Sequence, residues 1–166
     1  MDIKVQFFII LIFNKYKNQE VDIEDSIELF KPKLAHQKKI MTEIHFAIIN
    51  AVFTSIVILF QACLALGLPL GAASMGGKYP GKYPGKMRIV AVVNMIILDL
   101  LMMIVLVNSG MLLPQFRSFT EVAIWLAVAF YAIGTVLNTI TPSKIERIWA
   151  PVAAIQLITA IMVAIK

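Results

Sequence analysis

Four long apolar segments constrain the fold of this chain more than any other feature of its 166 residues. They cover residues 44–66, 89–107, 121–140 and 148–165. Each is close to the roughly 20 residues that a helix needs to cross the hydrocarbon core of a bilayer. The chain is also 60% hydrophobic and only 15% charged, which is far from the composition of soluble globular domains. We therefore expect four transmembrane helices.

Short connections between the last three segments predict antiparallel neighbours, and hence an all-α, integral membrane, up-and-down four-helix bundle over residues 41–166. Residues 108–110, Asn-Ser-Gly, are expected to end the second helix. Ser118 and Glu121 have the spacing of a capping box at the start of the third. Thr141 and Glu146 resemble an N-cap and a first-turn acid for the fourth helix, and Pro151 predicts a kink inside it.

The first 40 residues differ in composition and are expected to form a separate N-terminal extension. Residues 20–34 carry apolar side chains at helical spacing, and we expect this helix to end at Pro32. Two interpretations remain open. The extension is native and partly disordered, or it is an upstream addition to a protein that begins at Met41.

The loop over residues 67–88 contains the unit Gly-Lys-Tyr-Pro twice and is rich in turn-forming residues. The spacing of a phosphate-binding loop fails here, because Tyr79 stands where such a loop needs Ser or Thr. Its cations and aromatic rings are instead candidates for contact with anionic lipid headgroups: Lys78, Tyr79, Lys82, Tyr83, Lys86 and Arg88. The uncharged half, residues 67–77, is either solvated or folds back against the bundle over an inner cavity.

The cations of loops 67–88 and 141–147 predict their orientation. In the proposed topology these loops share one side of the membrane and carry six cations, against Arg117 and Lys166 on the other side. The positive-inside rule therefore places both loops in the cytoplasm, and the protein in the cell membrane. If the lysines at 31, 33, 38 and 39 are counted, both sides carry six cations. The rule therefore predicts an orientation only for a chain that begins at Met41.

Asp99 lies near the middle of the second apolar segment, where a carboxylate is costly unless it is protonated, paired or hydrated. Two roles are open for it: a proton or cation site, or a protonated side chain that hydrogen-bonds between helices. Polar groups on the apolar segments are candidate partners in a ligand or ion site: Asn50, Thr54, Gln61, Asn94 and Gln156. The first three are four and seven residues apart, which places them on one helical face.

Catalytic and metal-binding signatures are missing from the sequence. Cys63 is the only cysteine, and His36 and His45 are the only histidines, so neither a disulfide nor a Cys/His-rich metal site is expected. No nucleophile motif has its supporting residues. We expect no enzymatic activity, no cofactor and no nucleic acid partner.

The motifs Gly67-x-Pro-x-Gly71, Gly76-Gly77, Tyr79-Pro-Gly81 and Lys86-Met-Arg88 resemble those of a family of small, uncharacterised prokaryotic four-helix integral membrane proteins. The resemblance runs from about Met41 to the C-terminus. It implies the fold and the membrane location, and no activity, ligand or catalytic residue.

Two functions remain open from the sequence. The first is a binding or accessory subunit whose basic loop contacts lipid headgroups. The alternative is a small proton- or cation-coupled transporter that uses Asp99. Either one has the lipid bilayer as a partner, with a second copy of the chain or another membrane protein as further candidates.

Overall fold

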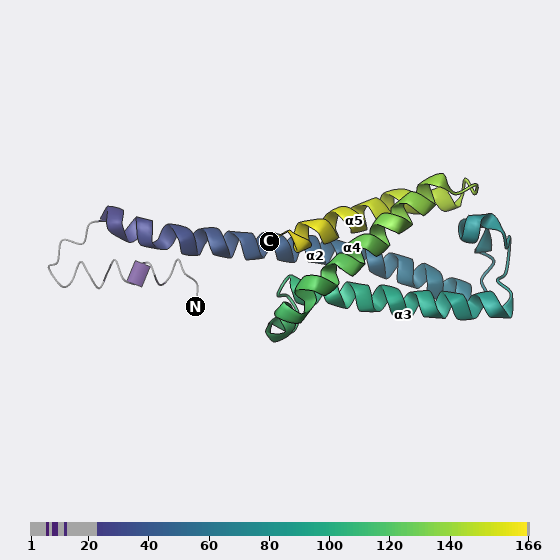
Figure 1. Cartoon of the computed structure of the whole chain (residues 1–166), viewed down its shortest axis with the longest axis horizontal. Coiled ribbons are helices and arrows are strands. Elements are labelled where there is room, and N and C mark those ends of the chain that lie inside the picture. Colours follow the sequence, from purple (N-terminus) through teal and green to yellow (C-terminus); the bar gives the residue numbers. More distant parts are fainter. Residues whose placement is uncertain (1–5, 7, 10–11, 13–22, 166) are drawn as a thin grey trace. The chain divides into compact units, whose positions relative to one another are not determined.

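The computed structural model describes residues 6, 8, 9, 12 and 23–165. These residues have the all-α four-helix fold that the sequence predicts. Its α-helices are α2 (Ile23–Leu66), α3 (Gly85–Asn108), α4 (Arg117–Ile140) and α5 (Trp149–Ala164). Short 3-10 turns lie between them: η1 (Gly71–Ala73), η2 (Met75–Gly77), η3 (Pro114–Phe116) and η4 (Glu146–Ile148). The described residues contain no strand. Figure 1 shows that α4 lies along α5 and crosses α3.

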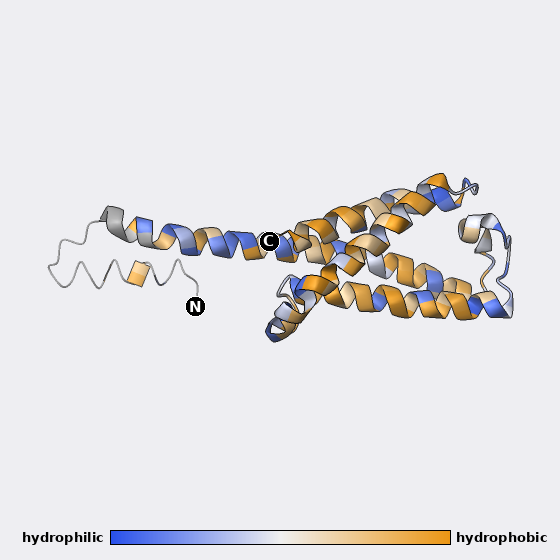
Figure 2. Cartoon of the chain, viewed as in Figure 1, coloured by the Kyte–Doolittle hydropathy of each residue, from blue (hydrophilic) through white to orange (hydrophobic). Residues whose placement is uncertain are grey.

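All four helices could cross a membrane by their length and composition. The qualifying spans are Phe30–Leu66, Gly85–Asn108, Pro114–Ile140 and Glu146–Ala164. The ribbon of these helices is mostly orange in Figure 2, the colour of hydrophobic residues, and many of their large apolar side chains are exposed. Val122 on α4 is 81% exposed and Ile89 on α3 is 66% exposed. An outer surface of this kind suits lipid better than water.

The chain separates into two compact units, residues 1–42 and residues 43–166. In the first unit, most of residues 1–22 lie outside the described part. The prediction that a helix ends at Pro32 is wrong, because α2 continues through this proline to Leu66. Proline removes a single backbone donor, and the hydrogen bonds of the neighbouring turns are enough to keep the helix intact here.

Several helix boundaries differ from the sequence prediction. The helix α4 begins at Arg117, so the proposed capping box is wrong: Ser118 and Glu121 both lie inside the helix. Pro151 is the third residue of α5, a position whose backbone N–H has no partner within the helix in any case. It therefore breaks no interior hydrogen bond. The end of α3 is confirmed, since the helix stops at Asn108 and Gly110 has a φ of +77°.

Small side chains let the helices of the second unit approach closely. Ala47 on α2, Ala127 on α4 and Ala160 on α5 are fully buried in one apolar core. Val105 on α3 and Ile124 on α4 fill the space between them. In lipid the hydrophobic effect provides little driving force for helices to associate. Close packing of this kind therefore supplies much of the stability.

The two ends of this bundle are closed in different ways. At one end, the guanidinium of Arg117 pairs with the carboxylate of Glu43 and joins α4 to α2. At the other end, residues 67–84 and residues 141–148 contact each other over the helix termini. We call this second end the loop end.

Candidate functional site

A buried network of polar side chains joins α2, α4 and α5 in the middle of the bundle. The Asn50 amide donates to the backbone carbonyl of Gln156 at 2.9 Å and to the Thr159 hydroxyl at 3.0 Å. The Gln156 amide donates to the Thr54 hydroxyl at 2.9 Å, and this hydroxyl lies 3.3 Å from that of Tyr131. All five side chains are buried, none more than 4% exposed. Because its members satisfy one another, we interpret this network as an interhelical lock.

Glycine allows the long loop to fold tightly at the loop end. The Gly71 N–H donates to the Gly81 carbonyl at 2.9 Å, which closes the loop upon itself. A Cβ atom at Gly71 would lie only 2.1 Å from the Tyr79 carbonyl oxygen, so no other residue fits without moving the backbone.

Contacts with the second loop hold η1 and η2 over the helix ends. The Ser143 hydroxyl donates to the Ala72 carbonyl at 2.7 Å. The Trp149 indole donates to the Ala73 carbonyl at 3.1 Å and packs on Phe60, with 4.5 Å between the ring centroids. The uncharged half of the loop is therefore folded back against the bundle, as in the second arrangement considered from the sequence.

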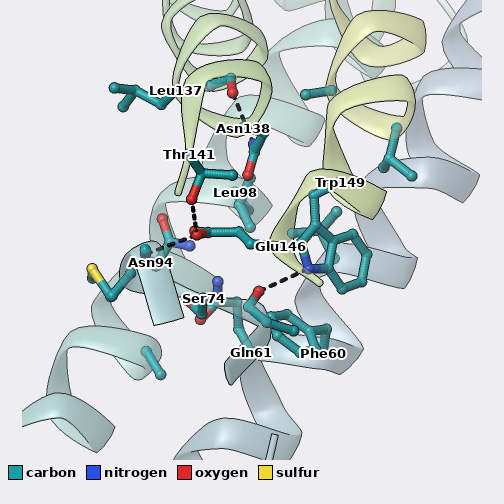
Figure 3. Close-up of a pocket in the computed structure, with 18 of the residues that line it drawn as sticks. Phe60, Gln61, Ser74, Asn94, Leu98, Leu137, Asn138, Thr141, Glu146 and Trp149 are labelled. Carbon is teal, nitrogen blue, oxygen red and sulfur yellow. Dashed lines mark hydrogen bonds between the residues drawn. The ribbon is translucent and has the colours of Figure 1, made fainter. Parts of the chain in front are cut away.

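Beneath these loops lies a cavity of about 670 Å³, lined by all four helices and by both loops. We call it the loop-end cavity, and Figure 3 shows part of its lining. Apolar side chains such as Phe60, Leu98, Phe130 and Leu137 form much of the wall. Its volume is in the range of small-molecule sites, which are mostly apolar with a few polar groups that orient the ligand.

Among the described residues that line this cavity, Glu146 is the only one with a charged side chain. One carboxylate oxygen, Oε2, accepts hydrogen bonds from the Gly76 N–H at 2.7 Å and from the Thr141 hydroxyl. The backbone of Gly76 has a φ of +69°, a conformation that glycine adopts readily. Both contacts use the same oxygen, so Oε1 accepts no hydrogen bond from the described residues. It is left for a donor or a cation in the cavity.

The amides of Gln61 and Asn94 line the cavity without a hydrogen-bond partner among the described residues. The buried hydroxyl of Tyr83 also lines it and makes no hydrogen bond of normal geometry with these residues, although the Ser74 side chain lies close to it. Burial raises the pKa of the Tyr83 hydroxyl, an effect that the Ser74 side chain partly offsets and the Glu146 carboxylate increases. Because unpaired polar groups are costly, they are expected to bind water or a ligand.

The predicted ligand residues are divided between these two regions. Gln61 and Asn94 line the loop-end cavity, Asn50 and Thr54 belong to the buried network, and Gln156 takes part in both. Asp99 belongs to neither region. Its side chain is exposed on the outer side of α3, and it makes no hydrogen bond or ion pair with the described residues.

The predicted headgroup residues also have different environments. Lys78, Lys82 and Lys86 are exposed. Arg88 has a role inside the protein, because its Nε donates to the Tyr83 carbonyl at 3.0 Å. Tyr79 and Tyr83 pack edge to face, with 6.0 Å between the ring centroids.

Sequence reasoning missed Glu146 and Trp149 as site residues. Glu146 was interpreted only as a helix-start acid, although it follows η2 by about 70 residues and is bonded to it. The available signal was a single acid in a short loop whose other polar side chains are hydroxyls and cations. This signal does not reveal which backbone N–H the carboxylate contacts.

Comparison of the chain with family models, with curated proteins and with solved structures finds no match. The family resemblance therefore stays a prediction. Within residues 23–165 and the few earlier positions described, no group of three or more His, Cys, Asp or Glu side chains could hold a metal ion.

Proposed function

We propose that this chain is a multi-pass protein of a cytoplasmic membrane that binds a small amphipathic molecule in the loop-end cavity, as a binding or accessory subunit. One observation carries the proposal: the cavity combines an apolar wall with a single carboxylate and with polar groups that have no protein partner. A site built in this way favours a ligand with an apolar body and one polar end.

The polar end of the ligand follows from the charge of the site. Among the described residues of the lining, Glu146 is the only one with an acidic or basic side chain that carries a formal charge, and Trp149 and Phe60 add aromatic rings to the same lining. A carboxylate and aromatic rings both favour cations. The ligand class that fits is therefore a small organic cation, such as an arylalkyl ammonium.

The position of the cavity agrees with a role near the membrane surface. In the proposed orientation, loops 67–88 and 141–147 face the cytoplasm, where the exposed Lys78, Lys82 and Lys86 reach anionic headgroups. The cavity then opens close to the interface, where amphipathic molecules concentrate. A transporter that uses Asp99 receives less support, because Asp99 does not line the cavity.

Fluorescence of Trp149 can test this proposal. The chain has two tryptophans, and Trp125→Phe leaves Trp149 as the only one. We expect 2-phenylethylammonium to change this fluorescence saturably in nanodiscs. The uncharged 2-phenylethanol should bind more weakly. Glu146→Gln should lower the affinity for the ammonium about tenfold or more, as expected for loss of a charged hydrogen bond, and leave that for the alcohol nearly unchanged.

Asp99→Asn is the matched control, because it changes an acid of the same bundle that lies outside the cavity. This variant should bind both probes like the parent protein. Equal ammonium affinity in the parent and in Glu146→Gln, or no saturable signal from either probe, would contradict the proposed function.

A further inference from the structure

Asp99 is an acid exposed on the outer surface of a membrane-spanning helix. It lies about 4 Å from the midpoint of α3, given a rise of about 1.5 Å per residue. Its neighbours on the outer face are large and apolar: Ile96 is 56% exposed and Leu100 is 58% exposed. In the bilayer, a single copy of the chain would hold this carboxyl group against lipid tails. Ionisable groups within spans normally face protein or water instead.

The apolar segments of the chain cannot neutralise Asp99. Residues 44–66, 89–107, 121–140 and 150–164 contain no lysine or arginine. The polar side chains of the buried network bond one another inside the bundle, on α2, α4 and α5. Among the described residues nothing pairs with the carboxyl group, so it is open to a group from outside this chain.

The residues around Asp99 have the spacing of a helix-pairing seam. Ile89, Val92, Ile96, Asp99 and Met103 are separated by three, four, three and four residues. This is the heptad pattern by which parallel helices pack against each other. The first four of these side chains are exposed and Met103 is half-buried, so the seam is accessible on the outer face of α3.

We propose that a second copy of this chain covers the seam, and that two α3 helices pair in parallel with their Asp99 side chains in contact. Copies inserted in the same direction place Asp99 at the same depth, so each carboxyl group meets its equivalent across a two-fold axis. One shared proton lets the pair form a hydrogen bond that is shielded from lipid.

A second copy explains the seam better than an unrelated partner does. A single polar residue in an otherwise apolar heptad seam fixes the register of two like helices, because any other register places it opposite apolar side chains. The seam has no other polar member between Ile89 and Met103. The proposed dimer is independent of ligand binding, because Asp99 is not part of the loop-end cavity.

Disulfide cross-linking in native membranes can locate the interface. Cys63 is the only cysteine, so Cys63→Ala gives a background for single cysteines. With Ile96→Cys we expect most of the chain to form a covalent dimer upon oxidation. Val122→Cys on α4 is the control, because that position is 81% exposed but lies on another helix. It should give little dimer.

Energy transfer between labelled copies in liposomes measures the contribution of Asp99. Asp99→Leu should weaken association about fivefold to thirtyfold, as expected for loss of an interhelical hydrogen bond in a membrane. Asp99→Asn should keep the association within about threefold, because two carboxamides can also pair. Binding of 2-phenylethylammonium by Asp99→Leu would show that this variant remains folded.

Two results would overturn the dimer. One is that the parent protein stays monomeric in liposomes, either alone or bound to a basic transmembrane partner. The other is equal association by the parent and by Asp99→Leu. Failure of ammonium binding alone would affect only the proposed function.

Discussion

Two groups of polar side chains in this bundle contain similar residue types and have opposite environments. In the buried network, Asn50 and Thr54 are fully buried and hydrogen-bonded to other helices. In the loop-end cavity, Gln61 and Asn94 line open space and have no partner among the described residues. Gln61 is only seven residues from Thr54 on the same helix. The amide groups alone therefore do not distinguish a structural lock from a binding site.

The difference lies in what each polar group gains from the protein. In a membrane bundle, a bonded amide holds helices together, whereas an unbonded amide costs free energy unless water or a ligand satisfies it. Substitutions by leucine should therefore lower the stability clearly in the buried network and change it little in the loop-end cavity, and this contrast can be measured.

The largest effect on stability is expected in the network. Asn50→Leu removes an amide that contacts α4 and α5, and leaves buried partners such as Thr54 and Thr159 without it. We expect a loss of about 2 kcal/mol in the free energy of unfolding, from several interhelical bonds that average about 0.6 kcal/mol each. Unfolding in mixed micelles with increasing SDS measures this loss.

The matched control is Asn94→Leu, which removes the same group where it has no protein partner. Its free energy of unfolding should change by less than about 0.5 kcal/mol. If both variants lost the same stability, the distinction between lock and cavity would be wrong.

A second, smaller effect concerns ligand binding by the cavity. Gln61→Leu and Asn94→Leu should each lower the affinity for 2-phenylethylammonium about twofold to tenfold, as expected for loss of one neutral hydrogen bond. Stability should remain as in the parent. Gln156→Leu should lower both stability and affinity, because Gln156 belongs to both regions. Titration of Trp149 fluorescence, together with SDS unfolding, checks all three variants.

The smallest effect is the pH dependence that comes from Tyr83. Burial raises the pKa of its hydroxyl above the ordinary value of 10.0, so the folded protein holds this proton more tightly than the unfolded chain. The resulting stability is fully present below pH 10 and decreases as the pH rises through the folded pKa. Tyr83→Phe should remove this part of the alkaline decrease.

Below pH 9 the same variant should be as stable as the parent or slightly more stable, because the hydroxyl it removes is buried near the Ser74 side chain without a hydrogen bond of normal geometry. Unfolding measured at intervals between pH 8 and pH 11 tests both expectations. If Tyr83→Phe lost stability at alkaline pH as the parent does, that loss would come from other groups.

Asp99 and Glu146 show which site residues the sequence can predict and which it cannot. Asp99 was identified at once, because a charge within an apolar segment is conspicuous. The direction of its side chain depends on which face of α3 meets the other helices, and the structure places it on the outer face. Glu146 lies in a loop, where an acid is ordinary, and it gains its place in the cavity only from contacts with Gly76 and Thr141.

The sequence by itself determined the number of membrane-length helices and the end of α3 at Asn108. These features depend on local properties, namely the length of apolar segments and the glycine at position 110. It also identified the polar residues of the bundle, because polar groups are rare in apolar segments.

Only the tertiary structure decided which of these polar groups are bonded, that α2 continues through Pro32, and that both loops close over a cavity. The first and the last of these outcomes depend on contacts between residues far apart in the chain. Ser143 and Ala72, for example, are 71 residues apart and share one hydrogen bond. Local pattern limits which helices can form, whereas the environment of each side chain is set by the packing of all of them together.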